Sequence, residues 1–140
     1  MSSGSRLSTG FAAWRYLAAA WALLFFYRVA LAVAPYRLVS RLLPEAKGDV
    51  APGWVQARTR WAIGRTAGAA LKATCLPQAM AAQTLLSLQG YSSWIRIGVR
   101  RSQDAGIQAH AWVITGDRVV VGDDERLDSF STLIDLRVPK

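Results

Sequence analysis

The chain has 140 residues, of which 52% are hydrophobic, and a formal net charge of +8 at pH 7. A chain of this length can bury one modest core, which leaves little room for a second domain. Despite the charge, a nucleic-acid-binding protein is excluded, because the sequence has no basic run, no aromatic RNA-binding motif and no paired Cys/His finger spacing.

The first predicted element is a helix at about residues 11–34, in which Arg28 is the only charge between Tyr16 and Ala34. This apolar stretch nearly reaches the ~20 residues that cross a bilayer. A core helix packed on the rest of the protein and a membrane-associated helix are both open, and the core helix is slightly favoured because Arg28 fits a protein edge better than hydrocarbon. A signal peptide cleaved after Ala34 is the third alternative, which Pro35 and Arg28 oppose.

The next predicted elements are a short amphipathic helix at 36–43, a loop at 44–53 with Pro and Gly at both ends, and a helix at 54–71. Residues 1–72 contain ten Lys/Arg and two Asp/Glu, whereas residues 73–140 contain seven of each. All the net charge therefore lies ahead of residue 73. Positive charge around an apolar helix indicates contact with an anionic membrane surface or with an acidic partner.

Cys75, the only cysteine, lies where a helix at about 75–89 is predicted to begin. Thr74 can cap this helix, and Pro77 in its first turn lacks only an N–H that would have no partner there. The positive end of the helix dipole favours a thiolate at Cys75, and the free backbone N–H groups could hold an oxyanion. Gln78, one turn further on, could line the same site or be an ordinary polar residue of the helix surface. A lone cysteine excludes an intramolecular disulfide and suits a reducing cytoplasm, and a buried inert thiol is the alternative.

Strands are predicted at 92–99, 108–115 and 118–122, the last two joined by a Gly116-Asp117 turn. A two-residue turn sets the facing pairs Thr115 with Arg118, Ile114 with Val119, Val113 with Val120, Trp112 with Val121, and His110 with Asp123. In this register Asp123 would accept the ring N–H of His110, the only histidine, and the other ring nitrogen could take a proton from Cys75. A loop one residue longer assigns this role to Asp124. A structural histidine beside a solvated acid is the alternative.

The tail, with Phe130, Leu133 and Leu136, is expected to form a last helical turn that covers the sheet. The polar segment 100–106 is placed to border a substrate groove. We expect no cofactor and no metal, because no phosphate loop is visible and one Cys and one His beside scattered acids fall short of a zinc site.

Five ordered segments carry a family resemblance: Arg60-Trp61-Ala62-Ile63, Cys75-Leu76-Pro77-Gln78-Ala79, Leu85-Leu86 with Gly90, Arg96-Ile97-Gly98-Val99-Arg100, and His110-Ala111-Trp112-Val113. Over about residues 54–124 the chain resembles the transglutaminase-like leader peptidases of lasso-peptide biosynthesis. His-Ala-Trp-Val alone is shared by many transglutaminase-like hydrolases, and the ordered set is more specific. The resemblance implies a triad of Cys75 as nucleophile, His110 as base and Asp123 as orienter. Ile114 stands where the family usually has an acidic residue.

The implied fold is α+β, with a transglutaminase-like or papain-like core at 54–140, in which the active-site helix packs on a small antiparallel sheet, and a helical extension at 1–53. The implied activity is a cysteine peptidase that removes the leader from a ribosomally made lasso precursor before macrolactam cyclisation. The region ahead of Trp54 does not alternate like the strands of a leader-recognition domain. The chain therefore resembles the split form of the family, whose partners are the precursor peptide, a separate leader-recognition protein and, as a further candidate, the lasso cyclase.

We expect the protein in the cytoplasm, with membrane-surface association through residues 16–34 as the open alternative. Two other functions compete with leader removal. One is acyl transfer to an amine, or amidase activity, by the same thiol. The other is a non-catalytic scaffold tethered at a membrane.

Overall fold

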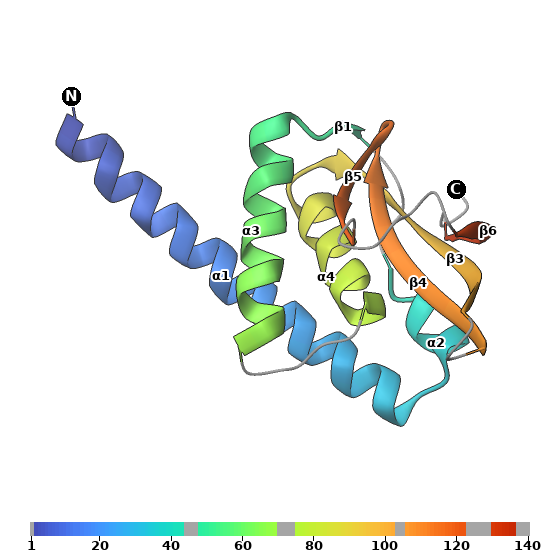
Figure 1. The fold of residues 1–140 in the computed structure, drawn as a ribbon. Coiled ribbons are helices and arrows are strands. Elements are labelled where there is room, and N and C mark those ends of the chain that lie inside the picture. The colour runs from blue at the N-terminus through green and yellow to red at the C-terminus, as the bar shows by residue number, and fades with distance from the viewer. Residues whose placement is uncertain (1, 44–47, 70–74, 103–105, 123–129, 137–140) are drawn as a thin grey trace.

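The computed structural model describes residues 2–43, 48–69, 75–102, 106–122 and 130–136 (Figure 1). The elements follow one another as α1 (Ser2–Val33), α2 (Tyr36–Ser40), β1 (Asp49–Val50), α3 (Gly53–Ala69), α4 (Cys75–Leu88), β2 (Tyr91–Ser92), β3 (Trp94–Ser102), β4 (Gly106–Thr115), β5 (Arg118–Val121) and β6 (Ser131–Leu136). The predicted α+β class, with a helical N-terminal part and a small antiparallel sheet, is confirmed.

The molecule has three layers (Figure 1). The first is a four-stranded sheet in the order β5-β4-β3-β6, with antiparallel neighbours throughout. The second layer is the pair of helices α4 and α3: α4 packs on β4, and α3 lies beside α4 and reaches β5. The third layer is α1, which crosses the side of this helix pair that faces away from the sheet and contacts both helices. α4 is thus the central element, which explains why its sequence is apolar around most of its circumference.

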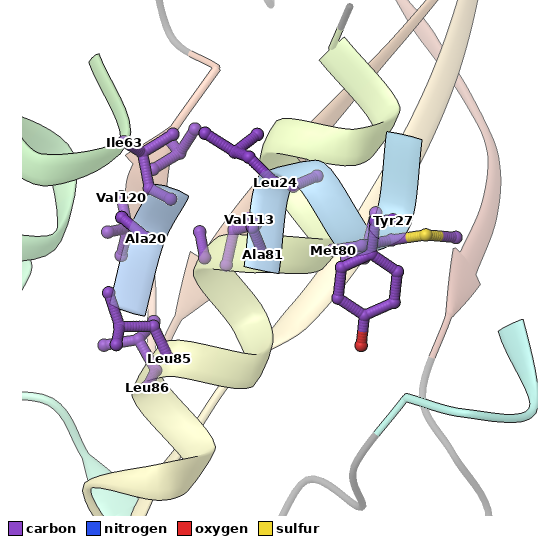
Figure 2. Close-up of a cluster of buried hydrophobic side chains, with 14 of the residues drawn as sticks. Ala20, Leu24, Tyr27, Ile63, Met80, Ala81, Leu85, Leu86, Val113 and Val120 are labelled. Carbon is purple, nitrogen blue, oxygen red and sulfur yellow. The ribbon is translucent and has the colours of Figure 1, made fainter. Parts of the chain in front are cut away.

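The core lies where the three layers meet (Figure 2). α1 contributes Ala20, Leu24 and Tyr27, each at most 2% exposed. These side chains meet Met80 and its neighbours on α4, and Val113 lies on the sheet side of the same cluster. A polar contact fixes the position of α1, because the Tyr27 hydroxyl lies 2.7 Å from Oγ1 of Thr84. The Thr84 hydroxyl itself donates to the Met80 carbonyl, so Tyr27 is the donor of the pair.

Arg60 joins α3 to the edge of the sheet. Its Nε donates to the carbonyl of Val120 at 2.8 Å, and one terminal nitrogen donates to the carbonyl of Val119 at 2.9 Å. β5 is an edge strand, whose outer carbonyls would otherwise have no partner within the sheet. The guanidinium therefore anchors the end of β5 to α3.

The predicted hairpin register is right near the turn and wrong beyond it. Thr115 faces Arg118 and Ile114 faces Val119, as expected. Val113, however, faces Val121 instead of Val120, because an irregularity between Val113 and Ile114 inserts one extra residue into β5. A bulge of this kind increases the local twist and redirects the strand end. The expected pairing of Trp112 with Val121 is shifted with it.

The tail forms a strand instead of the expected helical turn. β6 pairs with β3, with Ile95 facing Leu136 and Val99 facing Ser131. The physical reason is the second edge of the sheet, because β3 would otherwise present a row of unpaired N–H and C=O groups. The segment 131–136 also contains β-branched residues that favour an extended chain. The predicted loop at 44–53 contains a two-residue strand, β1, which pairs in parallel with β2.

Candidate active site

Cys75 is the first residue of α4, and its side chain is half-buried. Pro77 follows in the first turn, where a missing N–H costs no helical hydrogen bond. The backbone N–H groups of this turn have no partner one turn earlier within the helix and are oriented along its axis. Thr74, the predicted cap, lies outside the described residues. The local structure thus places a thiol beside backbone donors that can stabilise an oxyanion.

His110 lies on β4 and is 8% exposed. Its Nε2 lies 2.6 Å from the carbonyl oxygen of Gly122. A carbonyl oxygen can only accept a hydrogen bond, so Nε2 must carry the proton. In the neutral ring Nδ1 is then the acceptor nitrogen and the one that can serve as general base. The backbone of Gly122 therefore selects the tautomer of His110.

Gly122 can present its carbonyl in this way only because it has no side chain. Its φ is +99°, and a Cβ placed on it would lie 2.7 Å from Cβ of Trp112 and 2.9 Å from the Ala111 carbonyl oxygen. Any other residue would be strained by the backbone angle and blocked by these contacts. Sequence reasoning missed Gly122 because a backbone acceptor has no signature in the side-chain pattern. The one available signal is a glycine directly after the Val-Val-Val strand.

The plane of the imidazole is held by aromatic packing. The ring of His110 stacks on Trp112, with 5.8 Å between centroids, and lies 5.5 Å from Phe130. The Arg100 guanidinium covers Phe130 at 4.6 Å from its ring centroid. Gly98, which faces His110 across β3 and β4, makes room for this cluster, since a Cβ there would lie 2.7 Å from the Trp112 ring. These contacts restrict the rotation of the ring and so fix the directions of both ring nitrogens.

The nucleophile and the base meet at one cavity of about 310 Å³. It is lined by Cys75, Gln78, Ala109, His110, Ala111, Val121 and Gly122. The structure thus brings His110 of β4 to Cys75 and Gln78 of α4, which lie far from it in the sequence. Asp123 and Asp124 lie outside the described residues, so the assignment of either acid as the orienter stays a prediction.

A metal is not needed to explain these residues. In the described part of the chain, no three His, Cys, Asp or Glu side chains are grouped closely enough to hold a metal ion. A thiol at a helix start with an oriented imidazole supports nucleophilic acyl transfer instead, in which the thiolate attacks a carbonyl and a thioester forms. In the described residues a helix that begins with the cysteine packs on an antiparallel sheet that carries the histidine, an arrangement similar to that of papain-like thiol enzymes.

The chain belongs to the transglutaminase-like superfamily, whose sequence model matches residues 13–135. The matched segment begins in α1 and ends in β6, so it includes all three layers of the fold. Members of this superfamily are usually cysteine proteases or transglutaminases. A search of curated proteins and a search of solved structures each gave no match.

Proposed function

We propose that this protein is a cysteine peptidase that removes the leader from a ribosomally made lasso-precursor peptide before the macrolactam ring is closed. The observation that carries the proposal is the shared cavity of Cys75 and His110, with Nε2 of the imidazole committed to the Gly122 carbonyl. The choice of a leader peptide as substrate is supported by the ordered segments around these residues, among them Cys75–Ala79 and Arg96–Arg100, which resemble those of the lasso leader peptidases.

In the proposed reaction Nδ1 of His110 accepts the thiol proton of Cys75, and Sγ attacks the scissile carbonyl carbon. Backbone N–H groups of the first turn of α4 stabilise the negative charge on the carbonyl oxygen. The imidazolium then returns its proton to the leaving amine, the peptide C–N bond breaks, and a thioester remains on Cys75. Water attacks the thioester, His110 takes its proton, and the thiol is released. Leader removal exposes a new amine on the core peptide, which the cyclase requires.

The test is cleavage of the precursor peptide by the full chain, followed by mass spectrometry. Cys75→Ala and His110→Ala should each abolish cleavage while the far-UV circular dichroism spectrum stays that of the wild type. His110→Ala should also lower the unfolding temperature, because the buried imidazole packs on Trp112 and Phe130. Substantial product from either folded variant would overturn the proposal. Ser87→Ala, a small substitution at a partly exposed position of α4, serves as the control for handling losses.

Acyl transfer to an amine is the second candidate, because a thioester on Cys75 can be resolved by an amine as well as by water. Reactions with and without an added primary amine separate the two. A hydrolase gives the free carboxylic acid in both, whereas a transferase gives the amide when the amine is present. The cavity lining contains polar and small side chains in the described residues and does not by itself select the acceptor.

Leader recognition by a separate protein is part of the proposal. The described residues ahead of α3 form two helices and the two-residue strand β1, which is unlike a sheet that could hold an extended leader. We further propose that the reaction takes place in the cytoplasm, where a newly made precursor is available and a reducing environment keeps Cys75 as a thiol.

A further inference from the structure

α1 is apolar on two opposite sides, and the core covers only one of them. Its inner side carries the buried Ala20, Leu24 and Tyr27. The outer side continues onto α2 and carries large exposed hydrophobic residues. We call it the α1–α2 apolar face; its principal members, each between 48% and 79% exposed, are Trp14, Trp21, Phe25, Val33, Leu38 and Leu42.

The face is continuous along the two helices. Trp21 and Phe25 stack at 5.6 Å between ring centroids, which joins its two halves. One half contains a hollow of about 560 Å³ between Trp14 and Trp21, and the other a hollow of about 550 Å³ that runs from Phe25 to Leu42. Monomeric soluble proteins rarely expose a contiguous apolar patch of this kind without a function. A helix that is apolar all round needs cover on every side.

Basic residues surround the face, and acidic residues are absent from its helices. The sequences of α1, α2 and α3 contain no Asp or Glu. Arg65 lines the hollow at Trp21, Arg28 falls at the border of the outer side of α1 by helical spacing, and the exposed Arg37 and Arg41 flank Leu38 and Leu42. A surface of Trp, Phe and Leu bordered by arginines matches a bilayer interface with anionic headgroups.

We propose that the α1–α2 apolar face lies on an anionic phospholipid surface, with α1 in the plane of the membrane and its inner side still in the protein core. A second copy fits the face less well, because a symmetric dimer would bring the arginines of both copies together. The residues of Trp14–Val33 are long and apolar enough to cross a membrane by length and composition alone. Crossing would nevertheless remove Leu24 from the core and break the hydrogen bond between Tyr27 and Thr84.

This proposal is independent of the proposed peptidase activity. None of the residues of the face lines the cavity of Cys75 and His110. Failure of membrane binding would therefore leave the chemistry untouched, and failure of cleavage would leave membrane binding untouched.

The experiment is flotation of the full chain with vesicles of phosphatidylcholine alone and of phosphatidylcholine mixed with phosphatidylglycerol. We expect strong flotation with the mixed vesicles, little with phosphatidylcholine alone, and partial release by salt, because burial of apolar surface persists when charge is screened. The double variant Trp21→Ser/Phe25→Ser should lower the partition coefficient by at least about tenfold. Arg37→Gln should lower it by about fivefold on the mixed vesicles only.

Trp54→Ser is the matched control, because Trp54 is 62% exposed on α3 and lines neither hollow. It should bind like the wild type, and all variants should cleave a soluble precursor at the wild-type rate. Val33→Ser/Leu38→Ser, at the other end of the face, replaces the first double variant if that variant fails to fold.

Three kinds of result would overturn the proposal. The first is absence of flotation with the mixed vesicles, or an equal loss of binding in Trp54→Ser. The second is resistance to alkaline carbonate extraction of membranes from cells that make the protein, which would mean that α1 crosses the bilayer. The third is a stable dimer in light scattering that becomes a monomer in Trp21→Ser/Phe25→Ser, or a protein partner that displaces the vesicles from the face.

Discussion

His110 depends on a neighbour that contributes no side chain. The Gly122 carbonyl holds the Nε2 proton, while Trp112 and Phe130 hold the ring plane. The position of this carbonyl follows from a backbone angle that strongly favours glycine. At the scale of single residues, the candidate site is therefore sensitive to substitutions that change neither Cys75 nor His110.

Gly122→Ala should impair both stability and activity. The φ of +99° and the overlap with Trp112 and Ala111 should lower the free energy of unfolding by about 2 kcal/mol or more. The cleavage rate should fall further than this loss of folded protein explains, because the acceptor of Nε2 moves. Gly106→Ala is the matched control, since Gly106 also has a positive φ, +72°, but a Cβ there meets nothing within 4 Å. Denaturant unfolding and precursor cleavage are the measurements, and equal behaviour of the two variants would contradict the role of Gly122.

The choice between Asp123 and Asp124 is the second prediction at this scale. Past the bulge, Val113 faces Val121, and the same count carried to His110 reaches Asp124 instead of Asp123. Both acids lie outside the described residues. Because the Gly122 carbonyl is the acceptor of Nε2 and Nδ1 takes the thiol proton, an acid can act as the orienter only by sharing or replacing this carbonyl. On that condition we expect Asp124→Asn to lower the cleavage rate by a factor between about 10² and 10⁴, as the loss of a triad carboxylate does in other enzymes, and Asp123→Asn to have a small effect. The reverse order would show that the shifted register does not continue to His110.

The sequence is sufficient to identify the two reactive residues, Cys75 and His110, but not the groups that hold His110 in its orientation. Cys75 and His110 were identifiable because each is unique in its type and lies in a local pattern with a physical meaning, a helix start or an alternating strand. The Gly122 carbonyl and the space above Gly98 were not identifiable, because they depend on a φ angle and on the packing of aromatic rings from three segments. The acid was predicted from a register that a single extra residue changes.

At the scale of elements, the docking of α1 on α4 depends on a small number of contacts. Tyr27 is 2% exposed, and its hydroxyl donates to Thr84. Burial raises the pKa of Tyr27, because the charged phenolate would lose its hydration in the core. The folded protein therefore holds the phenol proton at a pH where the unfolded chain, with a pKa near 10.0, has lost it.

Tyr27→Phe tests this docking in two pH ranges. Near neutral pH the variant should lose about 0.5–1.5 kcal/mol of unfolding free energy, because the hydrogen bond to Thr84 is removed. The loss should be no larger than this, since the Thr84 hydroxyl keeps its bond to the Met80 carbonyl. Above about pH 10 the unfolded state binds fewer protons than the folded state, so wild-type stability should fall as pH rises. The fall should be shallower in Tyr27→Phe, and Tyr16, whose pKa burial also raises, accounts for part of what remains. Urea unfolding at neutral and alkaline pH is the measurement; equal slopes would contradict the assignment.

The helices were predicted more accurately than the sheet for a local reason. Pro77 and Gly90 mark the ends of α4 in the sequence itself. The bulge in β5 and the strand at 131–136 depend on distant segments: β6 forms because β3 offers a free edge, and no local pattern records that edge. The apolar residues of the tail therefore indicate a helical turn, although the segment forms a strand.

At the scale of the whole molecule, the excess positive charge and the candidate active site lie in different parts of the chain. The excess of arginine and lysine lies in residues 1–72, a stretch that contains α1, α2 and α3, whereas residues 73–140 are balanced. The cavity of Cys75 and His110 lies between α4 and the sheet. Substrate and surface contacts can thus be supplied by different parts of the molecule.

The proposed separate recognition protein should change the concentration dependence of cleavage. A partner that holds the leader near Cys75 raises the local concentration of the scissile bond, to the mM range for a short flexible tether. At low precursor concentration we expect a large increase in rate with the partner present, and at saturating precursor a small one. Rates measured by mass spectrometry in both regimes give the comparison. Equal rates at low concentration would show that the peptidase binds the leader by itself.

The bond between Tyr27 and Thr84 joins residues that are 57 positions apart, and this separation affects how the chain folds as it is made. α1 is synthesised before α3 and α4, and its inner side is not fully covered until α4 has been made. Closing so long a loop costs conformational entropy before the contact forms, which delays assembly relative to the β3–β4 hairpin. We therefore expect the nascent helix to expose apolar side chains in both directions for the time needed to add those residues. During that interval a lipid surface would protect the outer side of α1 against aggregation, while the inner side stays partly exposed until α4 is made.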